Sequence, residues 1–518
     1  MISFSEYPCC AWILASVCPL WRRLALSMPK IWSKIRLVTS PNASADTIRL
    51  WLERSGSREP LDIEIFLQVQ HSSNAPSTSR VPARSTSPWP YPNSPPVTTT
   101  HYVQIHASSV QPSTSIQIIP AAAPLVLPPS PTHHDGWGSI LSPPPVPPPA
   151  SLTPNPTSIQ SRASTHWGHI AIWYLVQQMH RWERFVFRFD KQFHSWTALK
   201  SITGDAPLLK EFEVSCAEPV YYGEWPWLPS AAPSASVVLP ELRKLTLQYT
   251  PFRWSSPMLR NNLRALNLRS LPTTNIALDR ILHIVTNNKA LEDLCLHFSN
   301  VLNPVLPLSS VTLPELKTLS IGGHYLMASL LDSLAAPSLQ ALTLDVEARD
   351  SIEDSISNLL SRSNHPPVNL LSLAYGGNGA PYYYSGGGLI ASWGFLTELS
   401  QLRTLQAGST PLDPLFTALG APDEDVATWM CPNLSQLALK ACPAHADGIP
   451  KLVQMVDMRN PEGGGGSGGP VRLRHLEMHE CTSVGQDVVD WLKSRVDKVI
   501  CVEPMFERTP HSPTYAYL

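Results

Sequence analysis

The stretch Leu242-Arg243-Lys244-Leu245-Thr246-Leu247 decides the fold, because its leucines at positions one, four and six recur through the second half of the chain. The same pattern begins at Leu263, Leu291, Leu316, Leu339, Val368, Leu402, Leu434 and Leu473, and degenerate copies rich in aromatic residues begin at Trp182 and Leu209. A single copy would be typical of any half-buried strand. Eleven copies predict an array in which each strand buries its apolar face against its neighbours.

Successive copies start 21 to 39 residues apart. This spacing is close to the roughly 20–29 residues of leucine-rich repeats, with loop insertions in the longer units. We therefore expect an α/β fold, a leucine-rich-repeat solenoid whose curved parallel sheet carries outer helices or irregular segments. The glycine-rich run Gly463–Gly469 is expected to form a flexible loop, and a helix from Val488 to Val496 should close the last unit.

Positions three, five and seven of each copy point away from the buried leucines, because side chains alternate across a strand. This face would be the concave face of the solenoid, and solenoids bind partners on such faces. For any single residue, an ordinary solvated sheet position is the alternative. The candidate partner-binding residues are Arg184, Arg188, Lys244, Arg269, Asp293, His297, Asp345, Lys440, His475, Glu477 and His479.

Charge and cysteine content exclude several classes of protein. The 38 Lys and Arg residues nearly balance 40 Asp and Glu residues, so charge gives no reason to expect binding to nucleic acid or to a membrane. Nine cysteines without a C-x-x-C pair argue against a disulfide framework and a zinc ribbon. The apolar run from Cys9 to Val17 is too short to span a bilayer, which needs about 20 apolar residues. We expect an intracellular protein, cytoplasmic or nuclear.

The N-terminal segment, residues 11–37, has an apolar spacing that suits short amphipathic helices broken near Pro19 and Pro29. Within it, Val17-Cys18-x-x-Trp21-Arg22-x-Leu24-Ala25 and Pro29-x-x-Trp32 resemble the later two-thirds of an F-box. The phrase from Ile48 to Gly56, followed by Pro60-Leu61-Asp62-Ile63, is similar to the link between the F-box and the first repeat strand in fungal, basidiomycete-type F-box proteins.

This resemblance implies a substrate receptor of a cullin-RING (SCF-type) ubiquitin ligase, which holds a target protein on its repeats and docks on a Skp-type adaptor. The adaptor-binding residues that it implies are Val17, Leu20, Trp21, Leu24, Pro29 and Trp32. The Leu-Pro-acidic opening of an F-box is not supplied by MISFSEYPCC. We therefore expect that the chain begins inside that domain or diverges there, and that it binds the adaptor weakly. A repeat scaffold that binds protein partners without a ligase is the alternative.

Residues 71–165 hold 21 of the 53 prolines and almost no charge, a composition that predicts a disordered Pro/Ser-rich insertion. A ligand for a WW-type domain and an artefact of the gene model are the alternatives. The expected organisation is a partial F-box-like helical segment at 1–37, a linker and first repeat strand at 38–70, the insertion, the repeat array at 166–503 and a tail at 504–518.

No set of residues predicts catalysis, so we expect no enzymatic activity and no cofactor. The run Gly465-Gly466-Ser467-Gly468-Gly469 matches G-x-S-x-G but lacks the strand and helix of a nucleophile elbow. His475 and His479 flank Glu477 on a strand, whereas the metal-binding H-E-x-x-H motif requires a helix. Cys442 and Cys481 hold the ninth position of their copies, where a structural role at the turn is expected. We expect a monomer that acts within a complex.

Overall fold

The computed structural model describes residues 10–38, 45–67, 169–189, 196–216, 239–250, 254, 256–260, 262–269, 276–347, 351–375, 390, 392–422, 428–443, 448–462, 469–481 and 484–502. The chain divides into two units, one formed by Met1–Gln70 with Asn155–Leu518 and the other by His71–Pro154. All described residues belong to the first unit. The predicted insertion at 71–165, the glycine loop and the tail lie outside the described residues, apart from Gly469 at the end of the loop.

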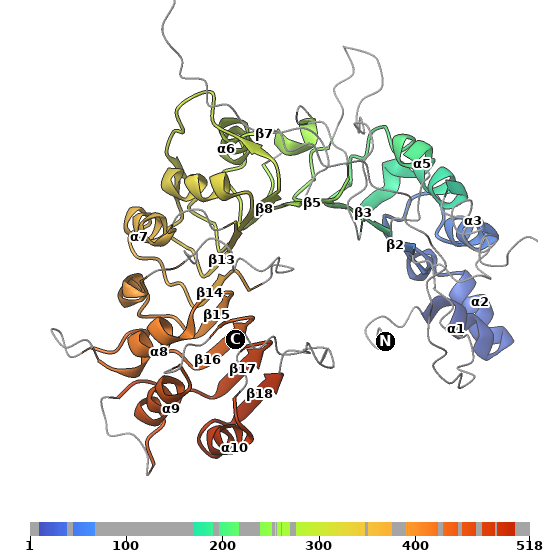
Figure 1. Ribbon diagram of the computed structural model, residues 1–518. Coiled ribbons are helices and arrows are strands. Elements are labelled where there is room, and N and C mark those ends of the chain that lie inside the picture. The colour runs from blue at the N-terminus through green and yellow to red at the C-terminus, as the bar shows by residue number, and fades with distance from the viewer. Residues whose placement is uncertain are drawn as a thin grey trace, which may run out of the picture. The chain divides into compact units, whose positions relative to one another are not determined.

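One parallel sheet of 14 strands runs through the first unit (Figure 1). In order of pairing its strands are β1 (Lys34–Val38), β2 (Leu61–Leu67), β3 (Trp182–Phe189), β4 (Glu211–Cys216), β5 (Lys244–Gln248), β6 (Ala265–Arg269), β8 (Asp293–Phe298), β11 (Thr318–Gly323), β13 (Ala341–Val346), β14 (Leu370–Leu373), β15 (Thr404–Gly408), β16 (Gln436–Lys440), β17 (His475–His479) and β18 (Lys498–Val502). Two further parallel pairs join β7 (Ile276–Ala277) to β9 (Val301–Leu302) and β10 (Val311–Thr312) to β12 (Leu334–Ala335). The architecture is mixed α/β and compatible with a solenoid.

Each of the eleven copies of the leucine pattern forms a strand, and neighbouring copies pair in the same register. Leu266, for example, pairs with Leu245 on one side and with Leu294 on the other. The residues at positions one, four and six are buried in every copy. The predicted burial of these three positions is therefore confirmed.

The sheet contains three strands beyond these copies. The strand that begins at Leu61 was expected from its alternating pattern, and it forms β2. Residues 34–37 were expected to be helical, but they belong to β1, where Ile35 and Leu37 pair with Ile63 and Ile65 and are buried. The alternation of apolar and basic residues in Lys34–Val38 suits a strand that covers the edge of β2. At the other end, β18 adds a strand after the last copy.

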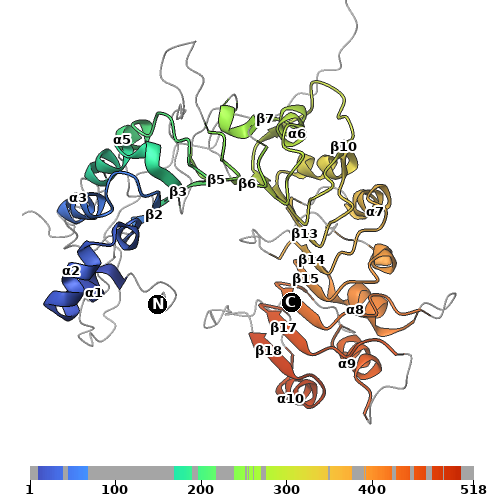
Figure 2. The same cartoon turned by 180° about the vertical axis from the view of Figure 1, so that it is seen from behind.

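The helices that follow the strands lie together on one side of the sheet (Figures 1 and 2). They are α5 (Trp196–Lys200), α6 (Leu278–Thr286), α7 (Glu353–Arg362), α8 (Leu412–Gly420), α9 (Gly448–Arg459) and α10 (Gln486–Arg495), with the 3₁₀ helices η2 (Met179–Arg181), η3 (Pro257–Arg260), η4 (Tyr325–Ser333) and η6 (Gly394–Glu398). Residues 169–176 are also helical. In the part of the chain that the structure describes, no helix has the length and apolar character needed to cross a membrane.

The N-terminal helices are interrupted near Pro19 and Pro29, as the sequence predicted. They are α1 (Cys10–Val17), α2 (Pro19–Leu26) and the 3₁₀ helix η1 (Pro29–Trp32), followed after β1 by α3 (Ala45–Arg54). Proline stands at the start of both α2 and η1, where its missing N–H group leaves no hydrogen bond unmade.

Buried polar side chains hold the return segments in place. The Asn288 side chain donates to the carbonyl oxygens of Leu259 (2.7 Å) and Ile284 (2.8 Å) and accepts from the Leu263 N–H at 2.9 Å. The Asn460 side chain donates to the Leu473 carbonyl oxygen and accepts from the Leu473 N–H. It also donates to the carbonyl oxygen of Arg495. These amides satisfy backbone groups that have no partner in the sheet, which is why a polar residue is tolerated in the core.

Candidate functional site: the open face of the sheet

The sheet face opposite the helices is formed by positions three, five and seven of the strands, and we call it the open face (Figure 2). All eleven candidate partner-binding residues occupy these positions, so the structure places them on one surface. Some position-five side chains are less exposed than the sequence pattern predicts. Val186 is fully buried and Thr246 is 8% exposed.

Near its first strands, the open face carries a network of charges. The Arg184 guanidinium lies 3.1 Å from Asp62 Oδ1 and 3.2 Å from Glu211 Oε2. The other oxygen of Glu211 lies 3.0 Å from Lys244 Nζ. Ion pairs of this kind contribute little stability individually, about 0–1 kcal/mol. Their main effect is to fix the positions of Arg184 and Lys244 on the surface.

Arg188 also forms an ion pair on the open face. Its Nε and Nη2 atoms donate to the two carboxylate oxygens of Glu213, at 2.5 and 3.0 Å, and its guanidinium lies 5.3 Å from the ring centre of Phe66. The hydrogen bonds to Glu213 raise the pKa of Arg188 above its ordinary value. A partner that contacts Arg188 therefore meets a planar group held between a carboxylate and an aromatic ring.

Along the middle of the sheet, position five is occupied by uncharged side chains that can form hydrogen bonds. These residues are Thr246, Asn267, Cys295, Ser320, Thr343, Ser372 and Gln406. Position five is thus neutral along the central strands, whereas positions three and seven of the same strands carry the charged residues Arg269, Asp293 and Asp345.

His297 lies on one of these central strands, at position seven of its copy. Its Nε2 atom is 2.9 Å from the Ser320 Oγ, and burial together with the nearby charge of Arg269 lowers its pKa to about 4. Arg269 itself donates to the Asn267 side-chain oxygen at 3.1 Å. At neutral pH His297 is therefore an uncharged hydrogen-bonding group.

Asp345 and Lys440 interact electrostatically across the two strands that separate them. Burial raises the pKa of Asp345, and the positive charge of Lys440 partly opposes this effect. At the equivalent positions, the intervening copies have the small residues Ala374 and Gly408. Asp293 stands apart from this pair, exposed at the start of β8.

The last charged group of the open face is centred on Glu477. Its two carboxylate oxygens lie 2.8 Å from His475 Nε2 and 3.4 Å from His479 Nε2. The first contact is short but poorly aligned for a hydrogen bond. Burial raises the pKa of Tyr375, and the negative charge of Glu477 adds to this effect. Among the described residues, no group of His, Cys, Asp and Glu side chains has an arrangement suited to a metal ion.

Several residues of the open face were not among the candidates. Asp62 and Glu64 form ion pairs with Arg184, and Arg36 lies 3.7 Å from Glu64. The alternation that begins at Leu61 was a sufficient signal for the first two, but Arg36 stands in a segment expected to be helical. Ser320 was missed because a small uncharged residue on a strand gives no sequence signal.

The residues implied as adaptor-binding fall into two groups. Val17, Leu20, Trp21 and Leu24 are all more than 40% exposed, and Pro29 is exposed at the start of η1. Trp32 is fully buried. It is therefore a core residue in this structure and offers no surface to a partner.

Internal contacts explain the burial of Trp32. Its Nε1 donates to the Ala25 carbonyl oxygen at 2.8 Å, and its ring meets Trp51 edge-on with ring centres 5.9 Å apart. The guanidinium of Arg54 covers the ring at 4.5 Å. Both contacting side chains come from α3, so this tryptophan joins the N-terminal helices to the start of the sheet.

Comparison of the chain with models of protein families gives no match, and comparison with curated protein sequences gives none either.

Proposed function

We propose that the protein is a leucine-rich-repeat substrate receptor of a cullin-RING ubiquitin ligase, with F-box-like helices that dock on a Skp-type adaptor. It would hold its target protein on the open face. The receptor performs no chemistry in this proposal, and its contribution is proximity, since it raises the local concentration of the target near the ligase.

The observation that carries the proposal is a concentration of exposed apolar side chains on α1, α2 and the turn that follows. These residues are Ile13, Val17, Leu20, Trp21, Leu24, Leu26 and Met28, each more than 40% exposed. Exposed apolar clusters of this kind are typical of interaction sites. Arg22 and Arg23 lie within the cluster, so it combines an apolar surface with positive charge.

Binding to a purified Skp-type adaptor tests the proposal. We expect weak binding by the chain and much tighter binding by a version extended with the Leu-Pro-acidic opening of an F-box. In the extended protein Trp21→Ala should abolish binding, because aromatic side chains in interaction sites commonly carry a large share of the binding energy.

Trp173→Ala is the matched control, since Trp173 is similarly exposed (55%) but lies in the helical residues 169–176. It should leave adaptor binding unchanged. If the extended protein fails to bind the adaptor, or if the two tryptophan changes act equally, the ligase function is excluded. The protein would then be a scaffold that binds partners through the open face without a ligase.

A further inference from the structure

Two thiols meet at the turns that follow β16 and β17. Cys442 and Cys481 each stand two residues after the paired residues Lys440 and His479. The residues between, Ala441 (φ 51°) and Glu480 (φ 55°), adopt the left-handed conformation. The chain turns inward there, and both cysteines are buried. The two thiols lie close enough for each to shift the pKa of the other.

This position suits a covalent bond between the two sulfur atoms. Neighbouring strands of a sheet lie roughly 4.8 Å apart, and the α-carbons of a disulfide lie roughly 4.4–6.8 Å apart. Because the two cysteines follow strands that pair in register, a bond between them requires no shift of β16 along β17. In the reduced protein the Cys442 thiol lies 3.5 Å from the Ala407 carbonyl oxygen and 3.4 Å from that of Lys440, and the Cys481 thiol lies 3.4 Å from that of His479. These thiols lose their donor protons when the disulfide forms.

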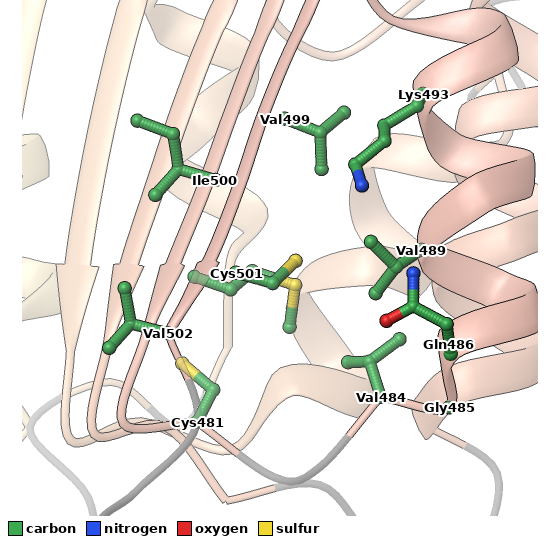
Figure 3. A pocket seen from close by; sticks show the side chains of 11 residues that line it. Cys481, Val484, Gly485, Gln486, Val489, Lys493, Val499, Ile500, Cys501 and Val502 are labelled. Atoms are coloured by element: carbon green, nitrogen blue, oxygen red, sulfur yellow. The ribbon is translucent and has the colours of Figure 1, made fainter.

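A pocket gives access to one of the two thiols. It has a volume of about 450 Å³ and lies between β18 and α10 (Figure 3). Cys481 and Cys501 belong to its lining, together with Lys493, whereas Cys442 does not. A small oxidant that enters the pocket therefore reaches Cys481 before Cys442.

We propose that Cys442 and Cys481 form a reversible disulfide in response to a small peroxide. The proposed disulfide requires neither the adaptor nor a partner on the open face. The neighbouring Cys442 thiol lowers the pKa of Cys481, whereas the Cys481 side chain and burial raise the pKa of Cys442. Cys481 is thus both the more accessible thiol and the one that more readily becomes the reactive thiolate.

The reaction balances in two steps. The Cys481 thiolate attacks one oxygen of hydrogen peroxide, the O–O bond breaks, and the leaving hydroxide takes up a proton to become water. The resulting sulfenic acid is then attacked by the sulfur of Cys442, which loses its proton as the S–S bond forms and the S–O bond breaks, releasing a second water. Two thiols and one peroxide give one disulfide and two waters.

Peptide mapping of the full chain tests the proposal. The purified protein is treated with equimolar hydrogen peroxide, remaining thiols are alkylated, and the digest is analysed by mass spectrometry before and after dithiothreitol. We expect a Cys442–Cys481 cross-linked peptide that disappears on reduction. Oxidation at other cysteines without this peptide, including a Cys481–Cys501 link, would overturn the assignment.

Variants establish the order of the steps. In Cys442→Ser, Cys481 should persist as a sulfenic acid that dimedone labels, whereas Cys481→Ser should show neither label nor cross-link. Cys431→Ser is the matched control, because Cys431 is equally buried but its thiol contacts the Leu396 carbonyl oxygen. It should leave the cross-link intact. Because the wild-type map needs no variant, a folding defect in any serine variant leaves the proposal testable.

Discussion

The Nε2 atom of His297 on β8 lies 2.9 Å from the Oγ atom of Ser320 on β11, and this contact joins two neighbouring strands on the open face. A Cβ atom on Gly322, two residues further along β11, would lie 2.5 Å from the other ring nitrogen of His297. The imidazole is therefore enclosed by its neighbours, which is the reason that its charged form is disfavoured.

The first prediction concerns pH. The pKa of His297 is lowered from 6.5 to about 4 in the folded state, so between these values the unfolded chain binds a proton that the folded protein does not. The folded state should lose on the order of 2 kcal/mol between pH 7 and pH 5 through this residue. His297→Gln should remove that share of the loss, as measured by urea unfolding at the two pH values. If His297→Gln lost as much unfolding free energy between pH 7 and pH 5 as the wild type, the imidazole would not be desolvated in the folded protein.

The second prediction tests which face of the sheet is buried. Leu342 is the middle of the three buried leucines in its copy, between Leu339 and Leu344, so Leu342→Ala should cost about 2–5 kcal/mol of unfolding free energy. Thr343→Ala, one residue along on the open face, should cost little. Equal destabilisation in chemical unfolding would mean that the two faces have been exchanged and that the open face is wrongly assigned.

A third prediction concerns the close approach of β14 and β15. A Cβ on Gly408 would lie 2.2 Å from the Ala374 carbonyl oxygen, which is a backbone atom and cannot rotate away. Gly408→Ala should therefore destabilise the protein by about 1–3 kcal/mol or more. Gly394→Ala is the control, since its nearest contact would be the Ser392 hydroxyl at 3.5 Å. Similar melting temperatures for the two variants would contradict the close approach.

The leucine spacing predicted the sheet and its register because burial alternates strictly along a strand, so local sequence carries that information. Ion pairing is not local. Arg184 contacts Asp62, a residue 122 positions earlier, and a local sequence pattern cannot predict that contact. The charged candidates were thus correctly placed on one face, but the extent to which they neutralise each other depends on strand order.

The tryptophans also show that a local pattern does not predict contacts with residues outside it. Trp21 and Trp32 both match the F-box pattern, yet one is half-exposed and the other is buried. The difference arises from α3, whose Trp51 and Arg54 cover Trp32. A pattern confined to residues 17–32 gives no information about α3.

The last prediction concerns the predicted insertion at 71–165, which separates β2 from β3 in the sequence although the two strands pair directly. The buried Arg181 adds to this contact, because its guanidinium donates to the carbonyl oxygen of Glu59 at 2.9 Å and to the hydroxyl of Ser55 at 2.9 Å. Desolvation lowers the pKa of Arg181, yet at neutral pH the side chain remains charged, since an arginine pKa lies far above 7. Breaking its contacts would leave a buried charge unsatisfied, which costs several kcal/mol.

A specific protease site engineered into residues 71–165 should therefore yield two fragments that remain associated. Gel filtration under native conditions should give one peak that contains both fragments, with a circular dichroism spectrum like that of the uncut protein. Arg181→Met, which keeps an unbranched apolar stem but removes the charge and the donors, should weaken the association of the cut fragments, whereas Lys200→Met at an exposed position should not. Spontaneous separation of the wild-type fragments would show that the covalent connection, rather than the β2–β3 pairing and Arg181, holds the N-terminal segment to the sheet.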